Sequence, residues 1–165
     1  MICTSSYSQL GNHENGISIS GDRGKSAKYT GPVYSALALK KSWWERWNML
    51  KDHMDYHESV VMYMDKYYET VLAELDPKEV YEDLDGKILL CYEESEYFCH
   101  RHVVAEWLEL CLGIHIPEVK NIDGELVEVQ RPKYVKELLL IVINNYNLNN
   151  KKLSKTNDKN PPISY

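Results

Sequence analysis

Two cysteines, a histidine and an arginine stand close together in the stretch KILLCYEESEYFCHRHVVAEWLEL, from Lys87 to Leu110. Cys91 closes an apolar run typical of a buried strand, and Cys99, His100 and Arg101 precede or open a helical pattern. Backbone amides and a partial positive charge at a helix amino terminus favour anions and lower the pKa of a nearby thiol. The spacing therefore predicts a thiol at Cys91 or Cys99 that is partly ionised at neutral pH.

Helical phase separates the neighbours of these thiols. His100 falls on the same face as Val103 and Val104, the buried stripe, whereas His102 falls on the polar face. Arg101 falls at the border of the stripe, where a guanidinium could bind a carboxylate or phosphate. We therefore expect His100 to act as acid or base, Arg101 to bind substrate, and His102 to do neither.

Two structural interpretations of the same residues stay open. A cysteine inside a buried strand, such as Cys91, is ordinarily a small core residue. Two cysteines with histidines can also hold zinc, although the separation of Cys91 and Cys99 differs from the tight C-x2-C spacing of structural zinc sites. We expect no metal and no cofactor, and keep a structural zinc site as an alternative.

Composition limits the class of protein. The chain has 165 residues, of which 44% are apolar, so it is long enough for one ordinary core and too short for two. The formal net charge is -6, with acidic and basic residues mixed along the chain, which makes extended duplex DNA a poor partner. A compact basic pocket remains compatible with this charge.

Cysteine usage and the amino terminus predict the compartment. Four cysteines do not form a dense secreted framework, and the opening MICTSSYSQLGN lacks the charged head and apolar run of a signal peptide. The longest apolar run, LLLIVI, is far shorter than a membrane span. We expect a soluble cytoplasmic protein with no membrane partner.

Strands and helices alternate along the chain. Apolar and β-prone residues predict strands at 2–7, 16–20, 87–92 and 114–119, and Asp123-Gly124 predicts a hairpin within 121–129. Helices are predicted from Trp43, after a capping box of Ser42 and Glu45, and over 57–75, 77 onward, the stretch ended by Gly113, and 132–146.

This alternation predicts an α/β fold, a small mainly parallel sheet flanked by helices with an edge hairpin near the carboxyl terminus. We expect one domain over 1–146 and a disordered polar tail over 147–165. In such folds ligands bind at the carboxyl ends of the strands, which places Cys91 and the loop after Ser20 on one edge.

The stretch LLCYEESEYFCHRHVVAEWL resembles the signature of an uncharacterised bacterial family, domain of unknown function 488 (YeaO-like), in which a strand ends in Cys-x-Glu and Cys-His-Arg opens a helix. The matching positions are Cys91, Glu93, Cys99, His100 and Arg101. ISISGDRGKSAKYTGPVYSALAL also resembles one branch of the family, so the resemblance runs from about Ile2 to Pro117. The long tyrosine-rich helical stretch between the two halves departs from it.

The resemblance implies which residues share a pocket. Asp22, Arg23, Lys25 and Tyr29 would face the segment from Cys91 to Arg101. Arg23, Lys25 and Arg101 would bind an anion, and Glu93 would act as a base or orient one of them.

These expectations combine into one function. A small anionic ligand, nucleotide-like or phosphate-bearing, would bind this pocket and react by a thiol-based mechanism at Cys91 or Cys99, with His100 and Glu93 assisting. The alternative is a non-catalytic module that binds a nucleotide or a nucleic-acid end. A homo-oligomer is also compatible with the tyrosine-rich stretch.

Overall fold

Two buried strands, β1 (Cys3–Ser6) and β3 (Ile88–Cys91), form the centre of a five-stranded sheet. The computed structural model describes residues 1–157, with side chains through residue 153. The strand order is β2-β3-β1-β4-β5, with β2 at Gly16–Ser18, β4 at Glu118–Ile122 and β5 at Glu125–Val129. The helices are α1 (Tyr7–Leu10), α2 (Lys41–Leu50), α3 (Tyr56–Thr70), α4 (Pro77–Asp83), α5 (His100–Leu112) and α6 (Tyr134–Asn157).

The pairing confirms the predicted α/β fold. Strands β1, β2, β3 and β4 pair in parallel, and only β5 runs antiparallel, as the edge strand of a hairpin with β4. Asp123 and Gly124 both have positive φ angles, 52° and 90°, which a two-residue hairpin turn of this hand requires. The Asp-Gly pair in the sequence was therefore a reliable signal for the hairpin.

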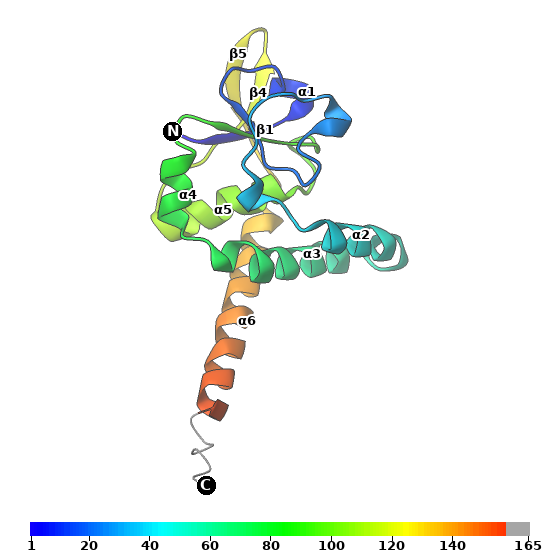
Figure 1. Cartoon of the computed structure of the whole chain (residues 1–165), viewed down its shortest axis with the longest axis vertical. Coiled ribbons are helices and arrows are strands. Elements are labelled where there is room, and N and C mark those ends of the chain that lie inside the picture. Colours follow the sequence, from blue (N-terminus) through cyan, green and yellow to red (C-terminus); the bar gives the residue numbers. More distant parts are fainter. Residues whose placement is uncertain (158–165) are drawn as a thin grey trace.

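Helices cover both faces of the sheet, which explains the uninterrupted apolar sequence of β3. On one face Leu89 joins the large core that includes α5, and on the other face Ile88 and Leu90 pack beneath Tyr7 and Leu10 of α1. Figure 1 shows α5 below the sheet and α1 above it. A strand covered on both faces has no polar side, so its residues do not alternate.

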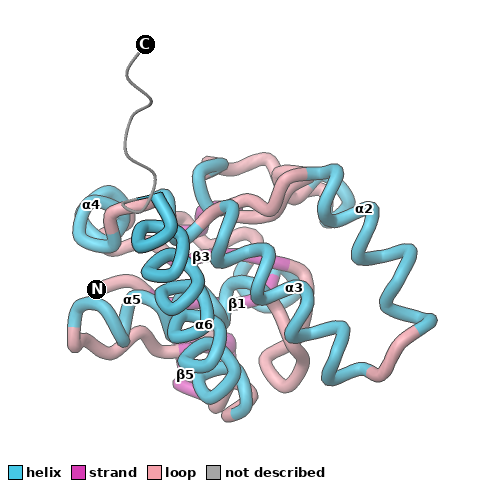
Figure 2. Tube along the Cα trace, turned by 90° about the horizontal axis from the view of Figure 1, so that it is seen from below, coloured by secondary structure: helices cyan, strands magenta, loops and turns pink. Residues whose placement is uncertain are grey.

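Helix α5 lies inside the molecule rather than on its surface. It contacts β1 and β3 on one side and α3, α4 and α6 on others. Figure 2 shows α6 beside it. The nine residues from His100 to Leu108 are all buried. Gly113 ends the helix with a φ of 65°, as predicted.

Several predicted boundaries were wrong by a few residues. Helix α2 begins at Lys41, and Ser42 makes no capping hydrogen bond, so the predicted capping box does not form. Helix α3 is capped by Asp55 and ends at Thr70, and Leu72–Glu74 forms a separate 3-10 turn. Helix α4 begins at Pro77, as predicted, and Asp76 caps it, because its carboxylate accepts from the amides of Lys78 and Glu79. Strand β4 begins at Glu118, later than predicted.

Helix α6 is longer than the sequence predicted. It continues through Asn157, so residues 147–157, assigned to a disordered tail, are helical, and the rest of that predicted tail lies outside the described residues. Its carboxyl half extends away from the sheet and the other helices (Figure 1). Within residues 1–157, no helix has the length and apolar character needed to cross a membrane.

Truncating the centre of β3 tests this packing. We expect Leu89→Ala to lower the free energy of unfolding by about 2 to 5 kcal/mol, because a fully buried leucine leaves a cavity when shortened. The matched control is Leu126→Ala on β5, where the side chain is 47% exposed and the loss should stay below about 0.5 kcal/mol. Equal losses in urea titrations of the two variants would contradict the assignment of β3 to the core.

Candidate functional site

Parallel pairing brings the ends of β2 and β3 to the same edge of the sheet. Ser18 pairs with Leu90, so Ile19 and Ser20 leave the sheet beside Cys91. The chain then returns through residues 92–98 to the amino terminus of α5, where Cys99 is the capping residue. The predicted juxtaposition of the loop after β2 with the loop after β3 is therefore confirmed.

Cys91, Cys99 and His100 form one compact cluster at this edge. The two sulfur atoms and a ring nitrogen of His100 all lie within 4.8 Å of one another. Cys91 Sγ is 3.5 Å from His100 Nδ1. The three side chains are only 4 to 7% exposed, so the cluster is nearly closed to solvent.

A backbone carbonyl fixes the orientation and tautomer of His100. The Nε2 atom lies 2.9 Å from the carbonyl oxygen of Ile19, which can only accept, so Nε2 carries the hydrogen. In the neutral ring this leaves the lone pair on Nδ1, the nitrogen that faces Cys91 Sγ. The imidazole therefore presents an acceptor, or a metal ligand, to the thiols.

The two thiols differ in acidity. Hydrogen bonding with Cys99, followed by burial, raises the pKa of Cys91 well above its usual value. Burial also opposes ionisation of Cys99, but the hydrogen bond with Cys91, the charge of Arg101 and the proximity of His100 together lower the pKa of Cys99 well below its usual value. The cluster therefore favours ionisation of Cys99 over ionisation of Cys91.

Arg101 does not lie on a rim, contrary to the sequence prediction. Its side chain is fully buried, and its Nη2 atom donates to Glu118 Oε1 over 2.8 Å while Nε lies 3.3 Å from both carboxylate oxygens. The guanidinium is therefore bound to Glu118 inside the protein, with Nη1 left without a hydrogen-bond partner among the described residues, and it does not reach a ligand at the surface as helical phase predicted. From this buried position its positive charge lowers the pKa of Cys99.

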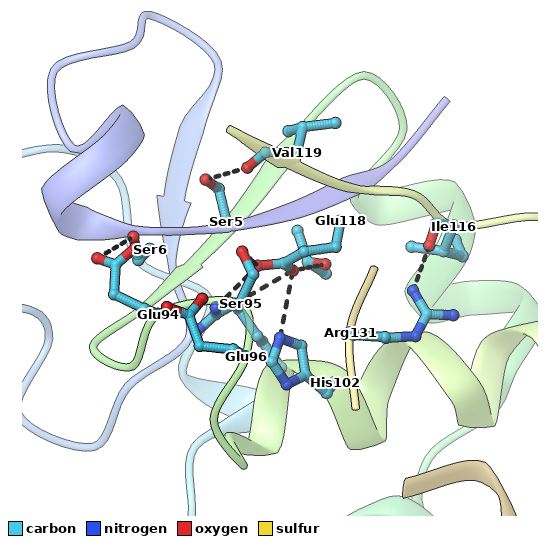
Figure 3. A network of polar contacts seen from close by, with 12 residues as sticks. Ser5, Ser6, Glu94, Ser95, Glu96, His102, Ile116, Glu118, Val119 and Arg131 are labelled. Atoms are coloured by element: carbon cyan, nitrogen blue, oxygen red, sulfur yellow. Dashed lines mark hydrogen bonds and ion pairs between the residues drawn. The ribbon is translucent and has the colours of Figure 1, made fainter. Parts of the chain in front are cut away.

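His102 is also buried, although its phase predicted the polar face. It is fully enclosed, with Nε2 3.4 Å from Glu118 Oε2. Figure 3 shows Glu118 between His102 and Ser95, whose hydroxyl donates to it over 2.9 Å, and Thr4 Oγ1 donates from β1. Burial opposes ionisation of Glu118, but the interactions of its carboxylate with His102 and with Arg101 hold the pKa of its carboxyl well below its usual value.

The prediction failed here because α5 has no polar face in its first nine residues. Sheet and helices surround it, so a polar residue at any phase must find a partner inside. Glu118, seventeen residues from Arg101 in the chain, is the partner that the sequence analysis missed. Its signal was an acidic residue inside the otherwise β-prone stretch IHIPEV, together with an arginine in an apolar helix.

Asp22 joins the loop after β2 to the segment after β3. Its carboxylate accepts from the amides of Gly24 and Ser26 and from the hydroxyl of Tyr92. Partial burial opposes ionisation, but these hydrogen bonds lower the pKa of Asp22 below its usual value. Asp22 thus organises the loop.

Tyr29 also has a structural contact. Its hydroxyl donates to the carbonyl of Gly16 over 2.8 Å, and its ring packs against Tyr7 with centroids 5.4 Å apart.

Three other predicted site residues are not part of the cluster. Arg23 and Lys25 are exposed on the loop that Asp22 organises, and Arg23 has a left-handed φ of 62°. Glu93 is exposed after β3, and the structure gives it no hydrogen bond or ion pair within residues 1–153. The structure therefore unites the cysteines and His100 and leaves the charged members of the predicted pocket at the surface.

Comparison with protein-family models, with curated proteins and with solved structures found no match for this chain. The resemblance to the family of domain of unknown function 488 therefore stays a prediction from the sequence.

Removing the charge of Glu118 tests the buried network. We expect Glu118→Gln to lower the free energy of unfolding by about 3 to 5 kcal/mol, because Arg101 would keep a buried charge without its counter-ion. Urea titration measures the loss. Glu125→Gln, at an exposed carboxylate of β5, is the matched control and should change the free energy by less than about 0.5 kcal/mol.

The same pair of variants gives a pH signature. Because the pKa of Glu118 is lower in the folded chain than its usual 4.5, its stabilisation is complete above pH 4.5 and is lost as pH falls toward the folded value. Wild type should therefore lose more stability below pH 4.5 than Glu118→Gln does. Parallel pH profiles would contradict an ionised Glu118.

Proposed function

We propose that this protein is a thiol-dependent cytoplasmic enzyme whose reactive group is the Cys91, Cys99 and His100 cluster and whose substrate is a small anion, nucleotide-like or phosphate-bearing. The observation that carries the proposal is the tautomer of His100, whose Nδ1 lone pair faces a thiol 3.5 Å away. A base oriented by a third group beside a thiol is the arrangement that activates a nucleophilic cysteine.

The roles follow from the acidity of the two thiols. Cys99 is the nucleophile, because its pKa is lowered at the amino terminus of α5 with Arg101 nearby. Cys91 keeps its proton and stabilises the thiolate by hydrogen bonding. His100 acts on Cys99 through Cys91: as the Cys99 proton passes to Cys91, the Cys91 proton passes to His100 Nδ1, so that Cys91 ends protonated beside the Cys99 thiolate.

Basic residues near this edge support an anionic substrate. Arg23, Lys25 and Lys28 are exposed on the loop after β2, and the hydrogen bond from Tyr92 to Asp22 ties that loop to the segment after Cys91. Because Cys99 is only 4% exposed, substrate entry requires the segment 92–98 to move. Tyr92, 36% exposed and packed edge-on against Tyr7, is the first residue of that segment.

A zinc site is the second candidate, and the ligand geometry favours it. Tetrahedral zinc with ordinary bond lengths separates a sulfur and a nitrogen ligand by about 3.5 Å, the distance between Cys91 Sγ and His100 Nδ1. Metal-binding histidines usually donate their other ring N–H to an acceptor, as His100 does to Ile19. Two thiolates would also neutralise the charge of a zinc ion in this closed setting.

Thiol titration tests the first candidate. In a Cys3→Ser/Cys111→Ser background, which keeps only the cluster thiols, we expect iodoacetamide to trap a thiol that ionises well below the usual pKa of 9.0. Adding Cys99→Ser should abolish that reaction. Adding Cys91→Ala should instead shift its midpoint to higher pH, because the hydrogen bond that supports the thiolate is lost. Ordinary or absent titration of both thiols would refute the nucleophile.

Ligand binding separates an enzyme from a binding module. If a nucleotide raises the melting temperature equally in wild type and in the Cys91→Ser and Cys99→Ser variants, the pocket binds without thiol chemistry.

Metal analysis tests the second candidate. We expect a zinc protein, purified without chelator, to carry about one zinc per chain and to lose it in the Cys99→Ser variant. Chelation should then lower the melting temperature of wild type. Cys111→Ser, at an exposed cysteine outside the cluster, is the control and should retain the metal. Absence of zinc, together with a titrating thiol, would leave the first candidate.

A further inference from the structure

A second site lies away from the cysteines, in a groove of about 400 Å³ between α5, the β4–β5 hairpin and the start of α6. Its lining is strongly charged. Among the residues that line it are the acidic Glu106, Glu118, Glu128 and Glu137 and the basic Arg131, Lys133 and Lys136. Apart from Glu118, which holds Arg101, the proposed thiol chemistry uses none of these residues.

Glu106 supplies the observation that points to a ligand. Its side chain lines the groove and is 7% exposed, and its Oε1 atom accepts from Arg131 Nε over 2.7 Å. The other oxygen, Oε2, is buried and has no hydrogen-bond partner within the described chain. A buried carboxylate oxygen without a donor is costly, so a donor from outside the chain is expected to fill this position.

Arg131 cannot supply that donor, because its guanidinium is already shared. Its Nη2 atom contacts Glu109 Oε1 at 2.8 Å and its Nη1 atom donates to the carbonyl of Ile116. Figure 3 shows the contact with Ile116. One positive charge, that of Arg131, therefore serves two carboxylates, Glu106 and Glu109, so Glu106 is not fully neutralised by it.

The groove is also lined by two lysines, together with Glu137 from the same turn of α6. Lys133 and Lys136, just before and within the first turn of α6, are exposed beside the groove. A ligand that satisfies both ends needs a positively charged N–H donor for Glu106 and an anionic group for the lysines.

We propose that this groove binds a small zwitterion, an α-amino acid, with its ammonium group on Glu106 Oε2 and its carboxylate toward Lys133 and Lys136. The charged ends select for amino acids over simple cations and over simple anions. The groove and the cysteine cluster share no residue, and the residues assigned to the ligand, Glu106, Lys133 and Lys136, take no part in the proposed thiol chemistry.

Thermal unfolding of the full chain with each of the twenty free L-amino acids tests the proposal. At about 10 mM, roughly a hundredfold excess over a Kd near 100 μM, at least one should raise the melting temperature by about 5 °C or more. Spermidine, a cation without a carboxylate, and inorganic phosphate should each give a much smaller shift. No shift with any amino acid, or an equal shift with spermidine, would overturn the proposal.

Two variants place the binding in the groove. Glu106→Gln should weaken the best amino acid at least about tenfold in calorimetric titration, because a charged hydrogen bond is lost. The exposed pair Lys133→Ala/Lys136→Ala, which leaves the buried contacts of Arg131 intact, should also weaken it and keeps the test valid if Glu106→Gln does not fold. Glu125→Gln is the control. Unchanged affinity in the lysine variant would overturn the site.

Discussion

The buried ion pair between Arg101 and Glu118 is the interaction on which the rest of the structure depends. It joins the start of α5 to the start of β4, and Thr4 and Ser95 complete the shell of donors from β1 and from the loop before α5. Side chains from β1, from the loop before α5 and from the start of α5 therefore meet at one carboxylate of β4. Such a pair is costly to bury and still more costly to leave half-made, so it selects one arrangement of these segments over others of similar apolar burial.

That arrangement also determines the chemistry of the cysteine cluster. With Arg101 held inside, its positive charge lies near Cys99 and not at the surface, where solvent would screen it. The carbonyl of Ile19 performs the matching task for His100 by holding the hydrogen on Nε2. The cluster atoms and the groups that contact them thus come from the start of α5 and from the ends of two neighbouring strands.

Sequence patterns predicted the architecture because each relevant signal is local. The apolar run at β3, the Asp-Gly turn of the hairpin, the cap at Asp76 and the glycine after α5 each involve residues within a few positions of one another. The sequence also predicted that the loops after β2 and β3 meet, because the carboxyl ends of parallel strands lie at the same edge of a sheet. Cys91, Cys99 and His100 were brought together by this rule.

The roles of Arg101 and His102 did not follow, because they depend on what surrounds α5. Helical phase assumes one face toward solvent, and here both residues are enclosed by the sheet and three other helices. The role of Glu118 could not be predicted for the same reason, because its pairing with Arg101 depends on tertiary packing. The length of α6 was misjudged because its polar carboxyl half shows no apolar period.

The two borders of the sheet differ in how they discourage self-association. At β2, the chain folds back so that Val33 bridges Ser18, and the open backbone groups of that border are partly occupied. Strand β5 has no such cover, yet Glu125 and Glu128 are exposed along it, so an approaching identical strand would meet like charges. Pairing of two copies through their β5 strands is thereby disfavoured.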